Sequence, residues 1–122
     1  MHPLASLTIE EHDGVQVARL EGEIDLSNAA ELLERLLAAI PNRSHGVIID
    51  LSATSYLDSA GLRLVFEARR ALSQRRQTLR VVAPPNTFVA DVLRATRLAE
   101  TVPIDGSLAD ALTAVSRRST PG

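Results

Sequence analysis

The chain has 122 residues, of which 45% are hydrophobic, and a formal net charge of −2. This length suits one domain with a buried core of its own. Only 2% of the residues are aromatic and basic charge is not in excess, so the chain lacks the basic surface and stacking rings of a nucleic acid binder. The absence of cysteine and lysine excludes disulfides, thiolate metal sites and Schiff-base chemistry. We expect no nucleic acid partner, no metal and no cofactor.

Membrane and export signals are also missing from the sequence. No run approaches the roughly 20 apolar residues that cross a bilayer, and residues 1–6 lack the charged start and apolar core of a signal peptide. We therefore expect a cytoplasmic protein without direct membrane insertion. Residues 5–117 are predicted to form the domain, and residues 1–4 and 118–122 to be flexible termini.

The first predicted elements are a β-hairpin, a helix and a buried strand. Residues 7–9 and 15–17 alternate apolar and polar side chains around Asp13-Gly14, a dipeptide suited to a tight hairpin turn. Leucines at helical spacing predict an amphipathic helix over residues 32–40. The apolar run at residues 47–51 indicates a central strand that is covered on both faces.

The second half of the chain continues the alternation of helices and strands. A helix is expected to begin at Ser59 or Ala60, with one apolar face formed by Leu62, Val65, Phe66 and Leu72. A strand, a short helix, an edge strand and a last helix are expected at residues 79–83, 88–93, 98–104 and 107–115. The order predicts a single α/β domain with a mixed, mostly parallel sheet of four to five strands and about four helices.

The predicted junction of strand and helix at Asp58-Ser59-Ala60-Gly61 carries the strongest functional signal. A helix N-terminus presents unpaired N–H groups and the positive end of the macrodipole, which favour an oxygen ligand or a phosphate. The simplest interpretation is that Ser59 caps the helix. Asp58 suits the same role, as Asp25 does before the first helix.

A serine at a strand-to-helix turn can also be the nucleophile of a serine hydrolase. A nucleophile elbow needs glycine two residues before the serine, and Leu57 occupies that position. The histidines are His2 in the N-terminal segment, His12 beside the hairpin turn and His45 in a predicted loop. We therefore expect no enzymatic activity.

Three motifs in order carry a resemblance to a known family. Residues 22–25, residues 47–52 and residues 56–62 resemble the STAS domain of bacterial anti-sigma factor antagonists, and the likeness covers nearly the whole chain. The resemblance implies that an anti-sigma factor, which is also a serine kinase, phosphorylates Ser59, and that a serine phosphatase restores the hydroxyl. The unphosphorylated antagonist would bind the anti-sigma factor and release a sigma factor.

The resemblance also implies a surface that contacts the partner, formed by Asp25, Asp58, Ser59, Ala60, Gly61 and Arg63. Two of these residues depart from the pattern of many relatives. Ala60 stands where a second hydroxyl is common, and Arg63 where a small residue is common. The arginine has two candidate partners, the carboxylate of Asp58 and a phosphate on Ser59.

Another role is open within the same family. STAS domains also serve as regulatory subunits of lipid or anion transporters and as parts of stress-sensing complexes. The complete Asp-Ser-x-Gly motif at residues 58–61 favours the antagonist.

Overall fold

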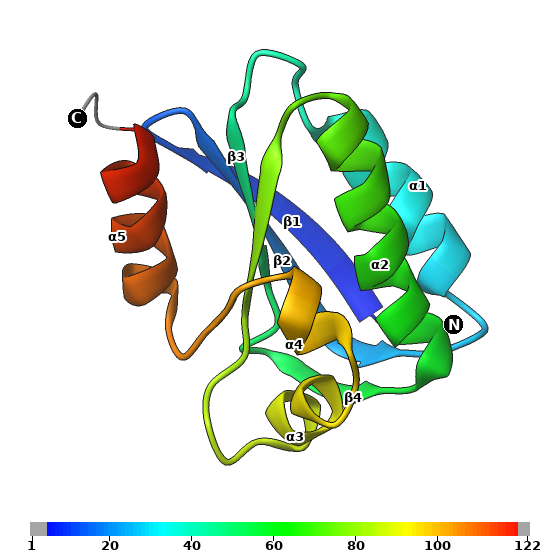
Figure 1. Ribbon diagram of the computed structural model, residues 1–122. Helices are drawn as coiled ribbons and strands as arrows, with labels where there is room; N and C mark the ends of the chain where they lie inside the picture. Colours follow the sequence, from blue (N-terminus) through cyan, green and yellow to red (C-terminus); the bar gives the residue numbers. More distant parts are fainter. Residues whose placement is uncertain (1–4, 120–122) are drawn as a thin grey trace.

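The computed structural model describes residues 5–119, with side chains described as far as residue 116. The predicted flexible residues 1–4 and 120–122 lie outside this part, whereas residues 118 and 119 belong to the last helix. The elements, labelled in Figure 1, are β1 (Ala5–His12), β2 (Val15–Ile24), α1 (Ala29–Ala39), β3 (Gly46–Asp50), β4 (Thr54–Leu57), α2 (Ser59–Gln74), β5 (Thr78–Val82), α3 (Phe88–Arg94), α4 (Leu98–Thr101), β6 (Ile104–Asp105) and α5 (Leu108–Ser119).

One mixed sheet forms the centre of the domain. Its strand order is β1-β2-β3-β5-β6. The strand β4 also pairs with β2, along residues 22–24, after the stretch of β2 that pairs with β3. Only the β1–β2 pair is antiparallel within the described residues; its turn places Asp13 and Gly14 at φ angles of 50° and 84°. The α/β fold with a mostly parallel sheet, and the opening hairpin, are thus confirmed.

Helices cover both faces of this sheet. In Figure 1, α1 and α2 lie on one side and α5 on the other. Alternate side chains of β3 divide between the two layers: Val47 and Ile49 belong to the larger core beneath α1 and α2, and Ile48 to a smaller core beneath α5. All five residues of β3 are buried, as predicted for a central strand.

The structure contains one strand and one helix more than the sequence predicted. The additional strand is β4, which pairs in parallel with the last residues of β2, with a register shift between Gly22 and Glu23. The edge strand expected at residues 98–104 is wrong over most of its length: residues 98–101 form α4, and only Ile104 and Asp105 pair with β5. Pro103 separates the two elements, which is consistent with its inability to donate a ladder hydrogen bond.

The predicted apolar face of α2 needs a partial correction. Val65 and Leu72 are fully buried, but Leu62 is half-buried and Phe66 is 39% exposed. The buried stripe of this helix consists instead of Gly61, Leu64, Val65, Ala68 and Leu72. Phe66 follows Val65 directly, and one residue in a helix is a rotation of about 100°, so its side chain points away from the core.

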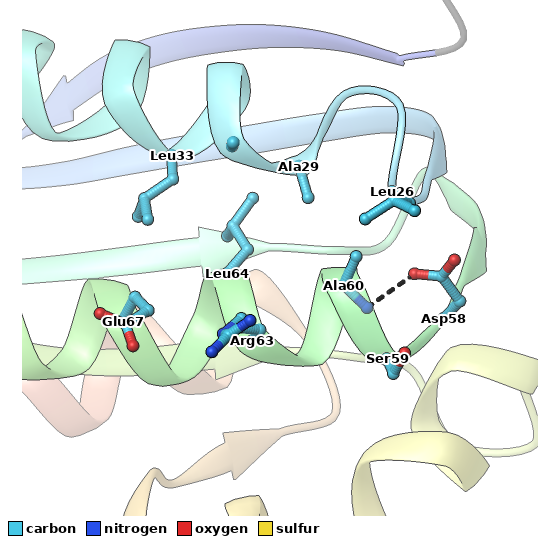
Figure 2. Close-up of a pocket in the computed structure, with 10 residues that line it drawn as sticks. Leu26, Ala29, Leu33, Asp58, Ser59, Ala60, Arg63, Leu64 and Glu67 are labelled. Carbon is cyan, nitrogen blue, oxygen red and sulfur yellow. Dashed lines mark hydrogen bonds between the residues drawn. The ribbon is translucent and has the colours of Figure 1, made fainter.

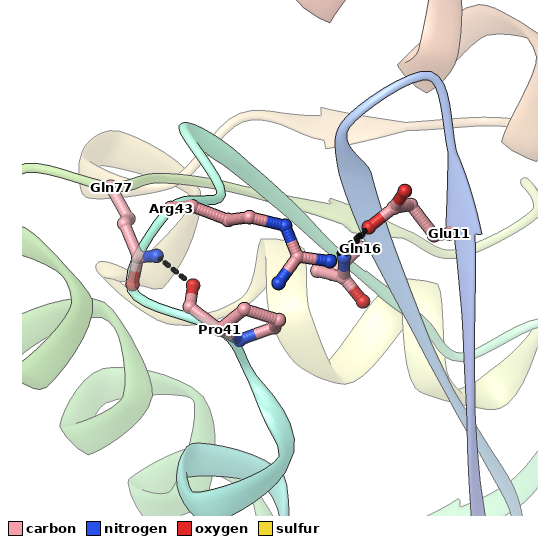
Figure 3. A network of polar contacts seen from close by, with 5 residues as sticks. All are labelled: Glu11, Gln16, Pro41, Arg43 and Gln77. Atoms are coloured by element: carbon pink, nitrogen blue, oxygen red, sulfur yellow. Dashed lines mark hydrogen bonds and ion pairs between the residues drawn. The ribbon is translucent and has the colours of Figure 1, made fainter.

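A polar network ties together the end of the sheet at which β3 and β5 begin (Figure 3). The Gln77 side-chain amide donates to the carbonyl oxygens of Pro41, at 2.8 Å, and Ser44, at 2.7 Å. Nearby, Glu11 accepts hydrogen bonds from Gln16 and Arg43. These contacts join strands β1 and β2 to the loop after α1, and that loop to the residue before β5. The candidate site lies at the opposite end of the sheet, where β2 and β4 finish.

Among the described residues, no helix combines the length and the apolar character needed to cross a membrane.

Candidate functional site

Asp58, rather than Ser59, caps helix α2. Its backbone is extended, with φ −107° and ψ −165°, which is the non-helical geometry of an N-cap residue. Its Oδ1 accepts hydrogen bonds from the N–H groups of Ala60, at 2.8 Å, and Gly61, at 3.3 Å, and its carbonyl accepts from Leu62. The predicted capping role of Ser59 is therefore wrong. Ser59 is the first helical residue, and it is exposed.

Gly61 seats the first turn of α2 against the strands beneath. A Cβ atom at this position would lie 2.6 Å from Cγ of Leu57 and 3.3 Å from Cγ2 of Ile24, closer than atoms can pack without a shift. Gly61 is buried. Gly61 thus lets the first turn of α2 pack closely on Leu57 and Ile24, and it presents no side chain to a partner.

Asp25 organises the turn between β2 and α1. Its Oδ1 accepts hydrogen bonds from the backbone N–H of Ser27, at 2.9 Å, and from the Ser27 hydroxyl. Asn28 is the N-cap residue of α1 and makes no side-chain capping bond to that helix; its amide oxygen accepts from the Asp25 N–H at 3.0 Å. Asp25 therefore precedes α1 without capping it.

The two turns lie side by side because β2 and β4 are parallel and end together. The backbone N–H of Asp58 donates to the carbonyl of Ile24 at 3.3 Å, which ties the start of one turn to the start of the other. The structure thus brings together the two sequence-predicted regions at residues 22–25 and 56–62. Their carboxylates, Asp25 and Asp58, are both partly exposed.

A groove of about 610 Å³ runs between α1 and α2 and reaches this junction (Figure 2). It is lined by Leu26, Ala29, Ala30, Leu33, Asp58, Ser59, Ala60, Arg63, Leu64 and Glu67. Four of the predicted site residues are in this set, whereas Asp25 and Gly61 are not. Because most of the wall is apolar and open to solvent, the groove offers a surface that a protein partner can cover.

Arg63 is the basic residue in this wall. Its side chain is exposed, and within the described part of the chain it takes part in no ion pair. The sequence left two partners open for this arginine, and pairing with Asp58 is not observed.

Several exposed apolar side chains near the junction were missed by the sequence analysis. Leu26 is 86% exposed at the mouth of the groove. Tyr56 and Phe88 stack with ring centroids 5.8 Å apart, and both are exposed. A leucine within the polar segment at residues 25–28 was the available signal, since turn residues are normally polar. The stacked pair joins β4 to α3, and nothing in the sequence pattern places those elements together.

The hydroxyl groups close to Ser59 differ in accessibility. The Thr54 side chain is buried and donates to the Leu20 carbonyl at 2.7 Å, and the Ser52 hydroxyl donates to Asp50. Ser52, Ser55 and Ser59 are all exposed, but of these three only Ser59 borders the groove. No three His, Asp or Glu side chains gather closely enough within residues 5–119 to hold a metal ion.

The fold and the junction are those of a STAS domain: the family model described as "STAS domain" matches residues 6–111, and this chain belongs to that family. It is similar to the anti-sigma-F factor antagonist RsfB of Mycobacterium tuberculosis, with 35% identity over 69 residues. That match spans 57% of this chain and 57% of the relative, a little more than half the length of each.

Solved structures extend the similarity to nearly the whole chain. The crystal structure of an anti-sigma factor antagonist from Mycobacterium paratuberculosis has a TM-score of 0.82 and 33% identity, and covers 92% of this chain and 94% of that one. Murine Slc26a9, an anion transporter, has a TM-score of 0.74 over 88% of this chain and 18% of its own. Its identity of 16% shows the fold alone. The resemblance to anti-sigma factor antagonists is confirmed.

Proposed function

We propose that this protein is an anti-sigma factor antagonist that phosphorylation of Ser59 inactivates. In its unphosphorylated form it binds an anti-sigma factor with serine kinase activity, and a sigma factor is released. Phosphorylation ends this binding, and a serine phosphatase restores it. The chain acts as binder and substrate rather than as an enzyme, in the cytoplasm. The names of its relatives and the motif at residues 58–61 support this proposal.

The observation that carries the proposal is the position of Ser59. Its exposed side chain lies on the first turn of α2 at the edge of an apolar groove that the exposed Leu26 also lines. A partner that covers this groove must remove water from the serine as well as from the leucine. Phosphorylation adds a charge of roughly −1.5 to −2, beside Asp58. The repulsion and the cost of dehydrating this charge then oppose docking.

In the phosphoryl transfer this chain supplies only the accepting hydroxyl group of Ser59. The γ-phosphoryl group of ATP forms a bond to Oγ of Ser59 while its bond to the β–γ bridging oxygen breaks; ADP leaves, and the hydroxyl proton passes to a base of the kinase. Asp58 keeps the turn in place through its bonds to Ala60 and Gly61. The fold is therefore expected to survive phosphorylation while the interface fails.

The antagonist role is preferred to a regulatory role in a transporter. The relatives named above at 33% identity or more are anti-sigma factor antagonists, whereas the likeness to the anion transporter rests on the fold. The transporter role predicts no kinase that acts on Ser59.

Mapping of the phosphate by mass spectrometry tests the proposal. The purified chain, incubated with its cognate kinase and ATP, is expected to gain one phosphate on Ser59. Ser59→Ala should abolish the gain, and Ser55→Ala is the matched control because its hydroxyl is exposed on the neighbouring strand but lies outside the groove. Phosphate mainly on Ser52, Thr54 or Ser55 would overturn the assignment.

A further inference from the structure

We infer that Arg63 is a clamp for the phosphate on Ser59: its guanidinium binds the phosphate within the same helix and favours the dianion. The inference rests on the proposed function, because it concerns the phosphorylated form of that site. It assigns a role to the arginine that departs from the pattern of many relatives.

The spacing on α2 brings the two groups within reach. Ser59 and Arg63 are four residues apart in one helix, so their Cβ atoms are neighbours on its surface, about 5–6 Å apart. The Cα–Cβ bonds of a helix tilt toward its N-terminus, so the long arginine side chain can turn back to reach a phosphate on Ser59. The planar guanidinium can donate two parallel hydrogen bonds to phosphate oxygens.

The helix end itself is already occupied. The N–H groups of Ala60 and Gly61, which would otherwise be free to bind an anion, donate to the side chain of Asp58. The N–H of Leu62 donates to the Asp58 carbonyl. These three N–H groups are therefore not available to a phosphate on Ser59 unless it displaces the cap, which favours a side-chain donor.

Arg63 is available to supply that donor. It is exposed, takes part in no ion pair among the described residues, and is the one basic side chain among the ten residues that line the groove. Among the described residues this guanidinium has no ion pair to lose when it binds the phosphate.

The other charged groups around Ser59 make such a clamp useful. Asp58 precedes the serine, Asp25 lies in the adjoining turn, and Glu67 lies on α2 one turn beyond Arg63. Three carboxylates oppose a doubly charged phosphate, and Arg63 lies between Ser59 and Glu67 along the helix. The clamp therefore offsets repulsion within the phosphorylated chain and holds its charge at the groove.

A phosphorus NMR titration of the full chain tests the clamp without a kinase, with phosphoserine introduced at position 59 during synthesis. In the wild-type chain the second pKa of the phosphate is expected to be about 0.2–0.4 unit lower than in Arg63→Gln. Arg63→Lys should retain much of this difference, since it keeps the charge. Arg70→Gln is the matched control: this exposed arginine lies on the same face of α2, about 16 Å along the helix axis from Ser59.

Equal pKa values in the wild type and Arg63→Gln would overturn the clamp. So would an equal shift in Arg70→Gln, because the effect would then be one of general charge. Should Arg63→Gln leave the pKa unchanged but weaken binding of the unphosphorylated chain to the anti-sigma factor by about 10-fold, Arg63 would be a partner contact instead. Circular dichroism confirms that each variant is folded.

The two proposals fail separately. A kinase that does not phosphorylate Ser59 would contradict the proposed function, while the titration of the synthetic phosphoserine would still report on Arg63.

Discussion

The two aspartate turns of the site look alike in sequence but differ in what they support. Asp25 and Asp58 each follow the end of a parallel strand, and each accepts an N–H group from the residue two positions later. Only Asp58 caps a helix; Asp25 holds a turn whose helix begins at Ala29, after Asn28. Asp58 therefore holds the start of a helix as well as bordering the groove, whereas Asp25 holds only its own turn.

The difference continues beneath the two turns. The first turn of α2 rests on Leu57 and Ile24 through a glycine that admits no side chain, whereas α1 begins with a buried alanine, Ala29. The α2 turn is therefore the more tightly fixed of the two, which suits the proposed phosphorylation of Ser59.

The largest expected effect on stability comes from Gly61→Ala, which places a methyl group in the more tightly packed turn, at the start of α2. The added methyl group overlaps Leu57, and such overpacking typically costs about 1–3 kcal/mol of unfolding free energy. Gly106→Ala is the control, since its new Cβ would lie 3.5 Å from Pro85, an ordinary contact. Urea unfolding measures both. A Gly61→Ala variant as stable as the wild type would show that the turn is not fixed by this packing.

Removal of the cap should have a smaller effect. Asp58→Ala leaves the N–H groups of Ala60 and Gly61 without their acceptor, and loss of an N-cap costs about 1 kcal/mol. Ser59→Ala is the matched comparison and should lose less than about 0.5 kcal/mol, because its hydroxyl makes no cap. Thermal unfolding of the two variants checks this order. Equal losses of unfolding free energy would show that the Ser59 hydroxyl stabilises the helix start as much as the Asp58 carboxylate does.

Asp25→Asn should have the smallest effect on the fold. The amide oxygen of asparagine can still accept from Ser27, so the free energy of unfolding should change by less than about 0.5 kcal/mol. If Asp25 belongs to the partner surface, the loss of its charge should weaken binding of the anti-sigma factor. Calorimetry and thermal unfolding of the same preparation separate the two effects. A large loss of stability with unchanged binding would make Asp25 a structural residue.

The sequence predicted the elements whose pattern is carried by many residues. The hairpin, the buried strand β3 and the long helices have clear periodicity, because burial on one or two faces dictates their apolar positions. The short elements β4 and α4 have four residues each, too few for a period to be recognised. Pairing of β4 also depends on the register shift in β2, which is a tertiary feature.

The candidate site was predictable in part for similar reasons. Cap chemistry and spacing identified the junction at residues 58–61, but the choice of Asp58 as cap depends on backbone dihedral angles that the sequence does not reveal. The groove depends on how α1 packs against α2, so Leu26 was missed and Gly61 was assigned to the surface.

The central claim is that the charge state of Ser59 decides whether the anti-sigma factor binds, and titration calorimetry with that partner tests it most directly. After incubation without ATP, the wild type and Ser59→Ala should bind equally, and Ser59→Asp weakly, because its carboxylate imitates part of the phosphate charge beside Asp58. After incubation with ATP, the wild type should lose binding while Ser59→Ala keeps it. Equal binding by all three proteins, with no effect of ATP, would contradict phosphorylation-controlled partner exchange.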